Sequence, residues 1–174
     1  MDNLKVTSKI KWCLNQKKGL ELVEPNEELT KAYIKKAEDS LRATEMLKNN
    51  KDWEISSSYY TMYFSLYAIL MKIGIKCEIH SCTISFMKNF LDTYFTIEES
   101  ELIEKSQNAR IDTQYYSDRN ISDNLYNEMI NKSVLFLAKC KEIANNLTEQ
   151  EIESIRKKIK KLKNNFKRPN LYIT

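Results

Sequence analysis

Apolar positions recur at three- and four-residue spacing along most of the chain, which is the period of amphipathic α-helices. The pattern predicts seven helical segments, at residues 4–15, 26–49, 52–73, 81–91, 96–119, 125–144 and 148–166. The third segment is the most hydrophobic, so we expect it at the centre of the core. The predicted fold class is all-α: an antiparallel helical bundle of four to five core helices with additional N- and C-terminal helices.

Residues that start or stop helices stand at most of the predicted ends. Asn26 and Ser81 are suited to cap helix starts through their side-chain oxygens. Gly74 is suited to the left-handed backbone that ends many helices. Capping boxes of the form S/T-x-x-E precede the fifth and the last segments, at Thr96–Glu99 and Thr148–Glu151. These local signals support the helix assignments independently of the apolar pattern.

The composition narrows the fold class and the domain organisation. The chain has 174 residues but two glycines and two prolines, too few for a β-sandwich, a barrel or a glycine-rich phosphate loop. Its length predicts one domain. We expect an N-terminal helix and loop over residues 1–25, a helical bundle over 26–147 and a basic C-terminal helix and tail over 148–174. The sequence contains neither a signal peptide nor an apolar run of membrane-spanning length, so it predicts a cytoplasmic protein without a membrane partner.

Positive charge is concentrated near the C-terminus. The chain carries 28 Lys and Arg against 24 Asp and Glu, and eight of these cations lie from Arg156 to Arg168, where no acidic residue occurs. Uncompensated cations favour an acidic partner, either nucleic acid, contacted by Lys157, Lys160 and Lys161, or the mildly acidic remainder of the protein. The apolar stripe beneath the lysines is also compatible with a membrane surface.

The pattern leaves open whether this basic helix packs on the bundle or projects from it. The last core position of the bundle is predicted near Leu147, so deleting the residues after Ile155 is expected to leave the bundle folded.

Four cysteines and a single histidine are the candidates for metal or redox chemistry. In a chain without an export signal, the cysteines are expected to be reduced thiols. His80 lies between Cys77 and Cys82, but structural zinc requires four ligands and no second pair of ligands is present in the sequence. We therefore predict no metal and no cofactor, and expect His80 to form a hydrogen bond near a helix start.

Two segments carry candidate binding chemistry. Residues 56–64 combine three serines with several aromatic rings, including Tyr59 and Tyr60. This composition fits a core helix whose hydroxyls reach polar partners; it also fits a close approach between helices or a shelf on which bases stack. The second segment is unusually polar, and Arg110 in it can form either an ion pair that fixes the fold or a bidentate contact with phosphate. Its candidate contact residues are Arg110, Asp112, Tyr115, Tyr116 and Arg119.

An ordered set of these motifs resembles the HEPN (higher eukaryotes and prokaryotes nucleotide-binding) family, in its short, single-domain prokaryotic branch. The resemblance covers approximately residues 29–147. It is carried, in chain order, by Ala32–Ala37 with Ser40-Leu41, Ser58–Phe64 with Ala68–Leu70, Gly74, His80-Ser81, Phe86, Phe90 and Ala109–Tyr116.

The resemblance implies a helical bundle that forms a homodimer and binds nucleotide or RNA. Many members are toxins paired with a minimal nucleotidyltransferase as antitoxin, and active members are metal-independent RNases with an Arg-x4–6-His motif. Arg110 matches the arginine, but tyrosines and a serine stand where the histidine is expected. The sequence therefore favours a non-catalytic binding protein. The alternative is an RNase that uses Arg110 with Tyr115 or with His80, which requires His80 to fold against Arg110.

Overall fold

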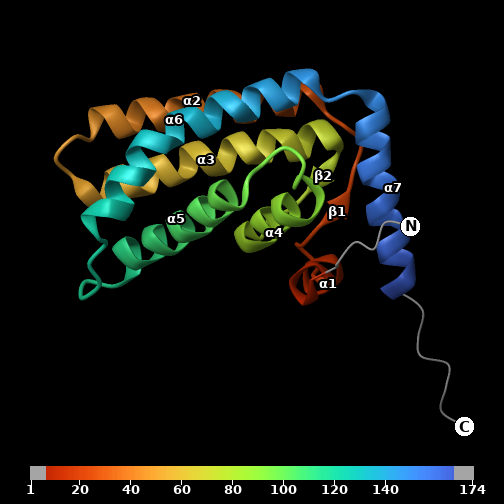
Figure 1. Ribbon diagram of the computed structural model, residues 1–174, viewed down its shortest axis with the longest axis horizontal. Helices are drawn as coiled ribbons and strands as arrows, with labels where there is room; N and C mark the ends of the chain where they lie inside the picture. Colours follow the sequence, from red (N-terminus) through yellow and green to blue (C-terminus); the bar gives the residue numbers. More distant parts are fainter. Residues whose placement is uncertain (1–6, 167–174) are drawn as a thin grey trace, which may run out of the picture.

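The computed structural model describes residues 7–166. Those residues form seven helices and one small sheet, and the all-α fold class predicted from the sequence is confirmed (Figure 1). In chain order the elements are α1 (Ser8–Asn15), β1 (Glu21–Leu22), α2 (Glu27–Met46), α3 (Lys51–Ile73), β2 (Ile75–Lys76), α4 (His80–Phe90), α5 (Ile97–Tyr115), α6 (Asp123–Asn146) and α7 (Glu149–Phe166).

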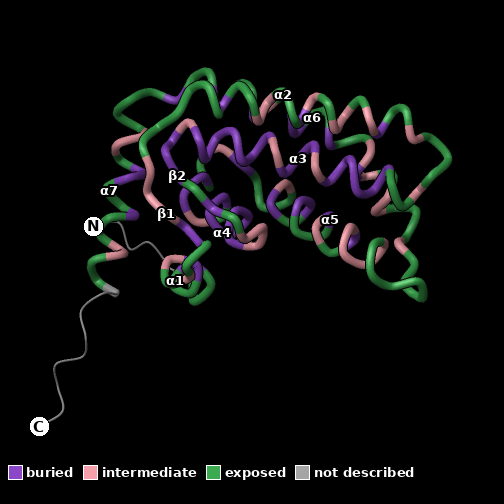
Figure 2. Tube along the Cα trace, turned by 180° about the vertical axis from the view of Figure 1, so that it is seen from behind, coloured by how far each residue is buried: buried purple, intermediate pink, exposed green. Residues whose placement is uncertain are grey.

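Helix α3 is the centre of the core, as its hydrophobicity predicts. Helices α2 and α6 pack along it, and α5 crosses it on the side opposite α2 (Figures 1 and 2). Completely buried aliphatic side chains follow one another along α3, among them Ile55, Leu66 and Ile69. Burying one such side chain contributes about 1.5–3 kcal/mol, so this helix supplies a large share of the hydrophobic stabilisation.

The predicted caps are mostly confirmed. The Asn26 side chain accepts a hydrogen bond from the Leu29 amide at 2.8 Å. Gly74 ends α3 with a φ of +80°, in the left-handed region that favours glycine. Both capping boxes form: Thr96 and Glu99 cap each other at the start of α5. At the start of α7 the carboxylate of Glu151 accepts from the Thr148 amide at 2.8 Å.

Several predicted helix ends are wrong, among them ends of α2, α4 and α5. Helix α2 ends at Met46 rather than near residue 49, because Asn49 adopts a positive φ of 78° in the turn to α3. Helix α4 starts at His80, with Ile79 rather than Ser81 at the cap position. Helix α5 ends at Tyr115, a turn earlier than predicted. In α4 the first turn is held by tertiary contacts instead of a side-chain cap, which a local sequence signal does not reveal.

Helix α7 packs across one end of the bundle rather than projecting from it (Figure 1). Ile155 is 7% exposed and Ile159 is 1% exposed, so both belong to the core. The prediction that the core ends near Leu147 is therefore wrong. The basic run begins with a buried residue, since Arg156 is also 7% exposed and points into the bundle.

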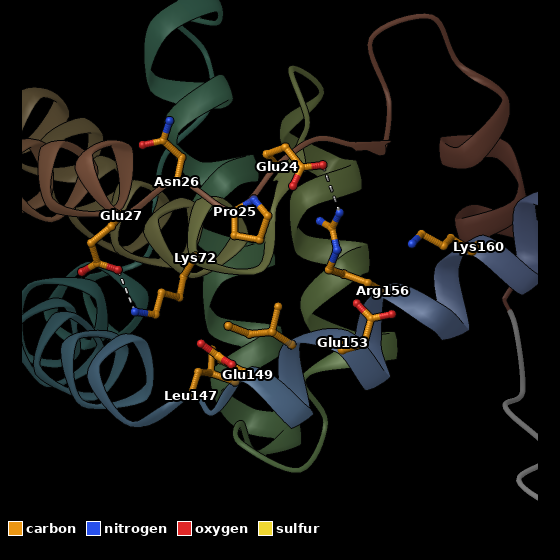
Figure 3. A pocket seen from close by; sticks show the side chains of 11 residues that line it. Glu24, Pro25, Asn26, Glu27, Lys72, Leu147, Glu149, Glu153, Arg156 and Lys160 are labelled. Atoms are coloured by element: carbon orange, nitrogen blue, oxygen red, sulfur yellow. Dashed lines mark hydrogen bonds and ion pairs between the residues drawn. The ribbon is translucent and has the colours of Figure 1, made fainter.

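Arg156 fastens α7 to the end of α3. Its Nη1 donates to the carbonyl oxygens of Val23 at 2.7 Å and of Ile73 and Gly74 at 3.0 Å each. A Cβ at position 74 would lie 2.3 Å from that nitrogen, so glycine is required there by both the backbone angle and the guanidinium. Figure 3 shows Arg156 beside Glu24 at this junction.

A disulfide joins α1 to the first turn of α4. Cys13 and Cys82 are bonded, their Cα atoms lie 5.6 Å apart, and both side chains are completely buried. The expectation that all four cysteines are reduced thiols is therefore wrong for this pair. The two residues are separated by 69 positions, and only the packing of α1 against α4 brings them within bonding distance.

Candidate functional site

Arg110 and His80 lie on either side of one tyrosine, although they come from different helices. An Nη2–H group of Arg110, on α5, donates to the Tyr60 hydroxyl at 2.7 Å. The imidazole of His80, at the start of α4, meets the same ring edge-on, with centroids 6.3 Å apart and an interplanar angle of 81°. The charge of Arg110 also acts on the titration of His80. His80 and Arg110 thus lie near the same ring, close enough for the charge of one to act on the other. We call Arg110, His80 and Tyr60 the Arg–His site.

His80 is held by rings of α3. Its Nδ1 shares a 2.7 Å hydrogen bond with the hydroxyl of Tyr59, and its imidazole stacks on Tyr63 at 3.9 Å with an interplanar angle of 10°. Burial and the nearby Arg110 charge lower the pKa of His80 below its ordinary value of 6.5. The imidazole is therefore mainly neutral at pH 7. When Nδ1 carries the proton, Nε2 has the lone pair that a general base requires.

Burial raises the pKa of Tyr59 well above its usual range, so its hydroxyl remains protonated. Tyr59 is completely buried. The prediction that it contacts RNA is therefore wrong, and its contribution is to position His80. Tyr60, one residue later on α3, is half-buried and keeps part of its ring accessible.

The positive charge of Arg110 has no anionic partner among the described residues. Within residues 7–166 Arg110 forms no ion pair, and its side-chain hydrogen bond goes to the hydroxyl of Tyr60 rather than to a carboxylate. Its Nε is buried and lacks a hydrogen-bond partner within residues 7–166. The interpretation of Arg110 as half of a buried ion pair within the chain is therefore wrong, while an ion pair between subunits stays a prediction. A partly desolvated guanidinium in this state favours binding an external anion.

The serines of α3 allow α5 and α2 to approach it closely. The Gln114 amide donates to the Ser56 hydroxyl at 3.3 Å, one turn from the Arg110–Tyr60 contact on both helices. On the other side, Thr44 donates to the Ser57 hydroxyl at 2.8 Å. Sequence reasoning missed Gln114, although it lies four residues after Arg110 and so on the same helical face.

The remaining candidates of the polar segment lie apart from the Arg–His site. Arg119 forms an ion pair with Asp112, and its guanidinium stacks on Tyr116 with 3.6 Å from Cζ to the ring centroid. Tyr115 is 70% exposed at the last position of α5. Because α5 ends there, residues beyond it do not continue its faces. In the described part of the chain, the structure shows no hydrogen bond between Tyr115 and Arg110, and the partnership of these two residues in catalysis stays a prediction.

The basic helix presents a mixed surface. Lys157, Lys160 and Lys161 are exposed, and Lys157 lies 3.9 Å from Glu153. Lys160 lines a groove of about 600 Å³ between α7 and the start of α2, shown in Figure 3. Four carboxylates and three cations line this groove: Glu24, Glu27, Glu149, Glu153, Lys72, Arg156 and Lys160. The lysines therefore face acids of the same protein along part of the helix.

The residues around His80 have partners other than a metal. Cys82 forms the disulfide with Cys13, and the thiol of Cys77 donates to the Ile79 carbonyl at 3.3 Å. Within residues 7–166 no three His, Cys, Asp or Glu side chains converge as a metal site requires.

Comparison with known proteins identifies the domain. The model of the HEPN domain family matches residues 30–143, which is well over half of the chain and includes every residue of the Arg–His site. A comparison with curated proteins found no match. No helix in the described part of the chain is both long enough and apolar enough to span a bilayer. HEPN domains bind nucleotides or RNA, commonly dimerise and are often RNases. On the family match and the helical fold, this chain belongs to the HEPN family.

Proposed function

We propose that this protein binds RNA or a nucleotide through a phosphate held by Arg110 at the Arg–His site. The observation that carries the proposal is the guanidinium of Arg110, which is partly buried and has no carboxylate partner among residues 7–166. Phosphate offers several acceptor oxygens to the fork of a guanidinium. The Tyr60 hydroxyl lies beside that fork and can contribute a further hydrogen bond.

The proposal is tested by RNA binding with a matched arginine control. Arg110→Gln is expected to weaken the binding of a fluorescent single-stranded RNA by about tenfold or more, since a hydrogen bond to a charged group contributes roughly 1.5–3 kcal/mol. Arg119→Gln removes a positive charge from the same polar segment, but that charge is already paired with Asp112. It is expected to change affinity by less than about twofold. Equal losses for both variants would contradict the proposal.

A second candidate function, metal-independent RNA cleavage, is favoured by the neutral His80 beside Arg110. Nε2 of His80 would accept the proton of a ribose 2′-hydroxyl while the 2′-oxygen attacks the adjacent phosphorus. The 5′-oxygen then leaves with a proton from water or from the imidazolium, and Arg110 stabilises the charge that develops on the phosphoryl oxygens. The products are a 2′,3′-cyclic phosphate and a 5′-hydroxyl.

Cleavage in the presence of EDTA that is lost in both His80→Gln and Arg110→Gln, and kept in Tyr115→Phe, would establish this activity. If His80→Gln and Arg110→Gln differ from the wild type in RNA affinity, but the wild type does not cleave RNA, the protein binds RNA without cleaving it.

The toxin-side role and its partners belong to the same proposal. The homodimer is supported by the family match, since HEPN domains commonly dimerise. The toxin-side role and the nucleotidyltransferase partner rest on the sequence resemblance alone. We expect a homodimer by light scattering, a gene for a minimal nucleotidyltransferase beside this one, and a stable complex between the two products. A monomer at micromolar concentration, or a nucleotidyltransferase that does not co-purify, would contradict these expectations.

A further inference from the structure

A window opens in the otherwise buried surface of α3. From Glu54 to Met71 every residue of the helix is buried except Tyr60 and Phe64, which are intermediate (Figure 2). The two positions are four residues apart and share one helical face. That face lies between α2 and α5, because Tyr33 of α2 is next to Phe64 and Arg110 of α5 is next to Tyr60. We call Tyr60, Phe64 and the neighbouring Tyr33 of α2 the aromatic strip.

Two rings of the strip are stacked on each other and the third is tilted against one of them. Tyr60 and Phe64 have centroids 5.3 Å apart and an interplanar angle of 19°. Tyr33 extends the strip from α2, with its centroid 6.1 Å from that of Phe64. Side chains of this kind bury most of their area when a fold can cover them. Here the neighbouring helices leave part of each ring uncovered.

A cation lies over each ring of the stacked pair. Lys36 Nζ is 4.9 Å from the centroid of Phe64, and Arg110 Cζ is 5.4 Å from that of Tyr60. Within the described residues, neither cation forms an ion pair with a carboxylate, although the adjacent Lys35 pairs with Asp39 at 3.2 Å. Lys36 and Arg110 thus add two unneutralised charges to the two ends of an aromatic surface.

Flat rings next to unpaired cations match the chemistry of an unpaired nucleotide. A base stacks on aromatic side chains whatever its identity, and the neighbouring phosphates bind the cations. Double-stranded RNA hides its base faces and would use only the cations. A second copy of this chain is a poorer occupant. The strip and its two cations include no acidic side chain, so meeting the same face of a second copy would bring cations against cations, and like charges oppose association.

We propose that the aromatic strip is a base-stacking subsite for single-stranded RNA, with Lys36 binding the phosphate next to the one held by Arg110. The proposal rests on the proposed function of the Arg–His site and specifies its ligand as an unpaired strand. Phe64 and Lys36 are the residues that it adds to that site.

The test measures the binding of two fluorescent RNA octamers, one of adenosines and one with abasic residues at its central positions. Phe64→Leu keeps an apolar side chain but removes the ring. It is expected to weaken the adenosine octamer about tenfold, the effect of one lost stacking contact, and to leave the abasic octamer unchanged. Lys36→Gln is expected to reduce the log–log salt slope by about 0.7, the value for one phosphate contact on a single strand. Its control, Lys35→Gln, removes the neighbouring lysine and should leave the slope unchanged.

The outcomes separate this proposal from the one on which it rests. If Arg110→Gln loses affinity while Phe64→Leu and Lys36→Gln bind as the wild type does, the strip is not a subsite and the Arg–His site stands. If Arg110→Gln also binds normally, the proposed function itself fails. A conversion of dimer to monomer by Phe64→Leu or Lys36→Gln would identify the strip as a self-association surface and overturn the proposal. Should Phe64→Leu unfold, the salt slope of Lys36→Gln decides alone.

Discussion

Replacing Arg156 by leucine removes the contact that fastens α7 to the end of α3. The guanidinium donates to three backbone carbonyls, at 2.7, 3.0 and 3.0 Å. Its side chain is 9% exposed, so water compensates little for the loss. The ion pair with Glu24 contributes little, because it is 4.0 Å long and Glu24 is 96% exposed. The backbone hydrogen bonds therefore determine the effect.

The expected loss follows from the carbonyls left behind. The Gly74 carbonyl keeps a hydrogen bond from the Val23 amide at 2.9 Å. The carbonyls of Val23 and Ile73 lose the donor that Arg156 supplies; the Ile73 contact is buried and the Val23 contact is partly buried. A buried unsatisfied group costs about 1–3 kcal/mol, and the lost hydrogen bonds to a charged donor add to it. We expect Arg156→Leu to lower the free energy of unfolding by about 4 kcal/mol. In a protein of this length that is a decrease of about 8–16 °C in Tm.

Thermal and urea unfolding, followed by circular dichroism, measure this loss directly. The control is Lys157→Leu, which removes an adjacent cation that is 72% exposed and should change stability by less than about 0.5 kcal/mol. RNA affinity measured below the transition should be the same for Arg156→Leu and the wild type. If Arg156→Leu unfolded at the wild-type temperature but lost RNA affinity, Arg156 would belong to an exposed nucleic-acid surface and the structural role would be refuted.

Three further predictions concern the fold and the Arg–His site. Deleting the residues after Ile155 should lower Tm, because core positions of α7 lie in the deleted part; an unchanged Tm would contradict the packing of α7. Reducing the bond between Cys13 and Cys82 should lower the free energy of unfolding by about 4 kcal/mol, the entropic effect of opening a loop of 69 residues, and Tm measured with and without dithiothreitol tests it. NMR titration should give His80 a pKa below its ordinary 6.5, and Arg110→Gln should raise it because a nearby positive charge is removed. In the wild type, His80 binds a proton more readily in the unfolded chain than in the folded one, so the free energy of unfolding should decrease as the pH falls below 6.5. A wild-type pKa at or above 6.5 would refute the burial argument.

Helix caps were the part of the fold that the sequence predicted best. Asn26, Gly74 and the two capping boxes act through hydrogen bonds within a few residues, so their signal is local and survives without tertiary information. The prediction that Ser81 caps α4 is wrong because the start of this helix is determined by distant residues. The first turn of α4 is fixed by the hydrogen bond of His80 to Tyr59 and by the disulfide of Cys82, and both partners lie far away in the sequence.

The burial of Arg156 in the basic helix was indicated by its position in the sequence, but the basic composition around it hid that indication. Arg156 lies four residues after Ile152 and three before Ile159, so it falls within the apolar stripe rather than on the charged face. That position indicates a buried arginine, and it is where the structure places it. Counting Arg156 with the other cations concealed the difference between one structural guanidinium and the exposed lysines at positions 157, 160 and 161.

Of the Arg–His site, the sequence could identify the residues but not their arrangement. In the Arg-x4–6-His motif of active HEPN RNases, the arginine and the histidine are close neighbours in the sequence. Here Arg110 comes from α5 and His80 from α4, so their proximity depends on how both helices pack against α3. Lys36 and Phe64 were likewise visible in the sequence, but only the packing of α2 beside α3 brings them together.

This assembly from separate helices changes what controls the chemistry of the site. A histidine a few residues after its arginine would be positioned mainly by the local backbone. His80 instead depends on the first turn of α4, which is fixed from one side by the Tyr59 hydroxyl and the Tyr63 ring and from the other by the Cys13–Cys82 bond two residues later. The buried tyrosines of α3 therefore serve the site as much as the core. They position a neutral imidazole near a guanidinium that has no carboxylate partner among the described residues. A partly desolvated charge of this kind lowers the stability of the fold, and a bound anion would offset that effect.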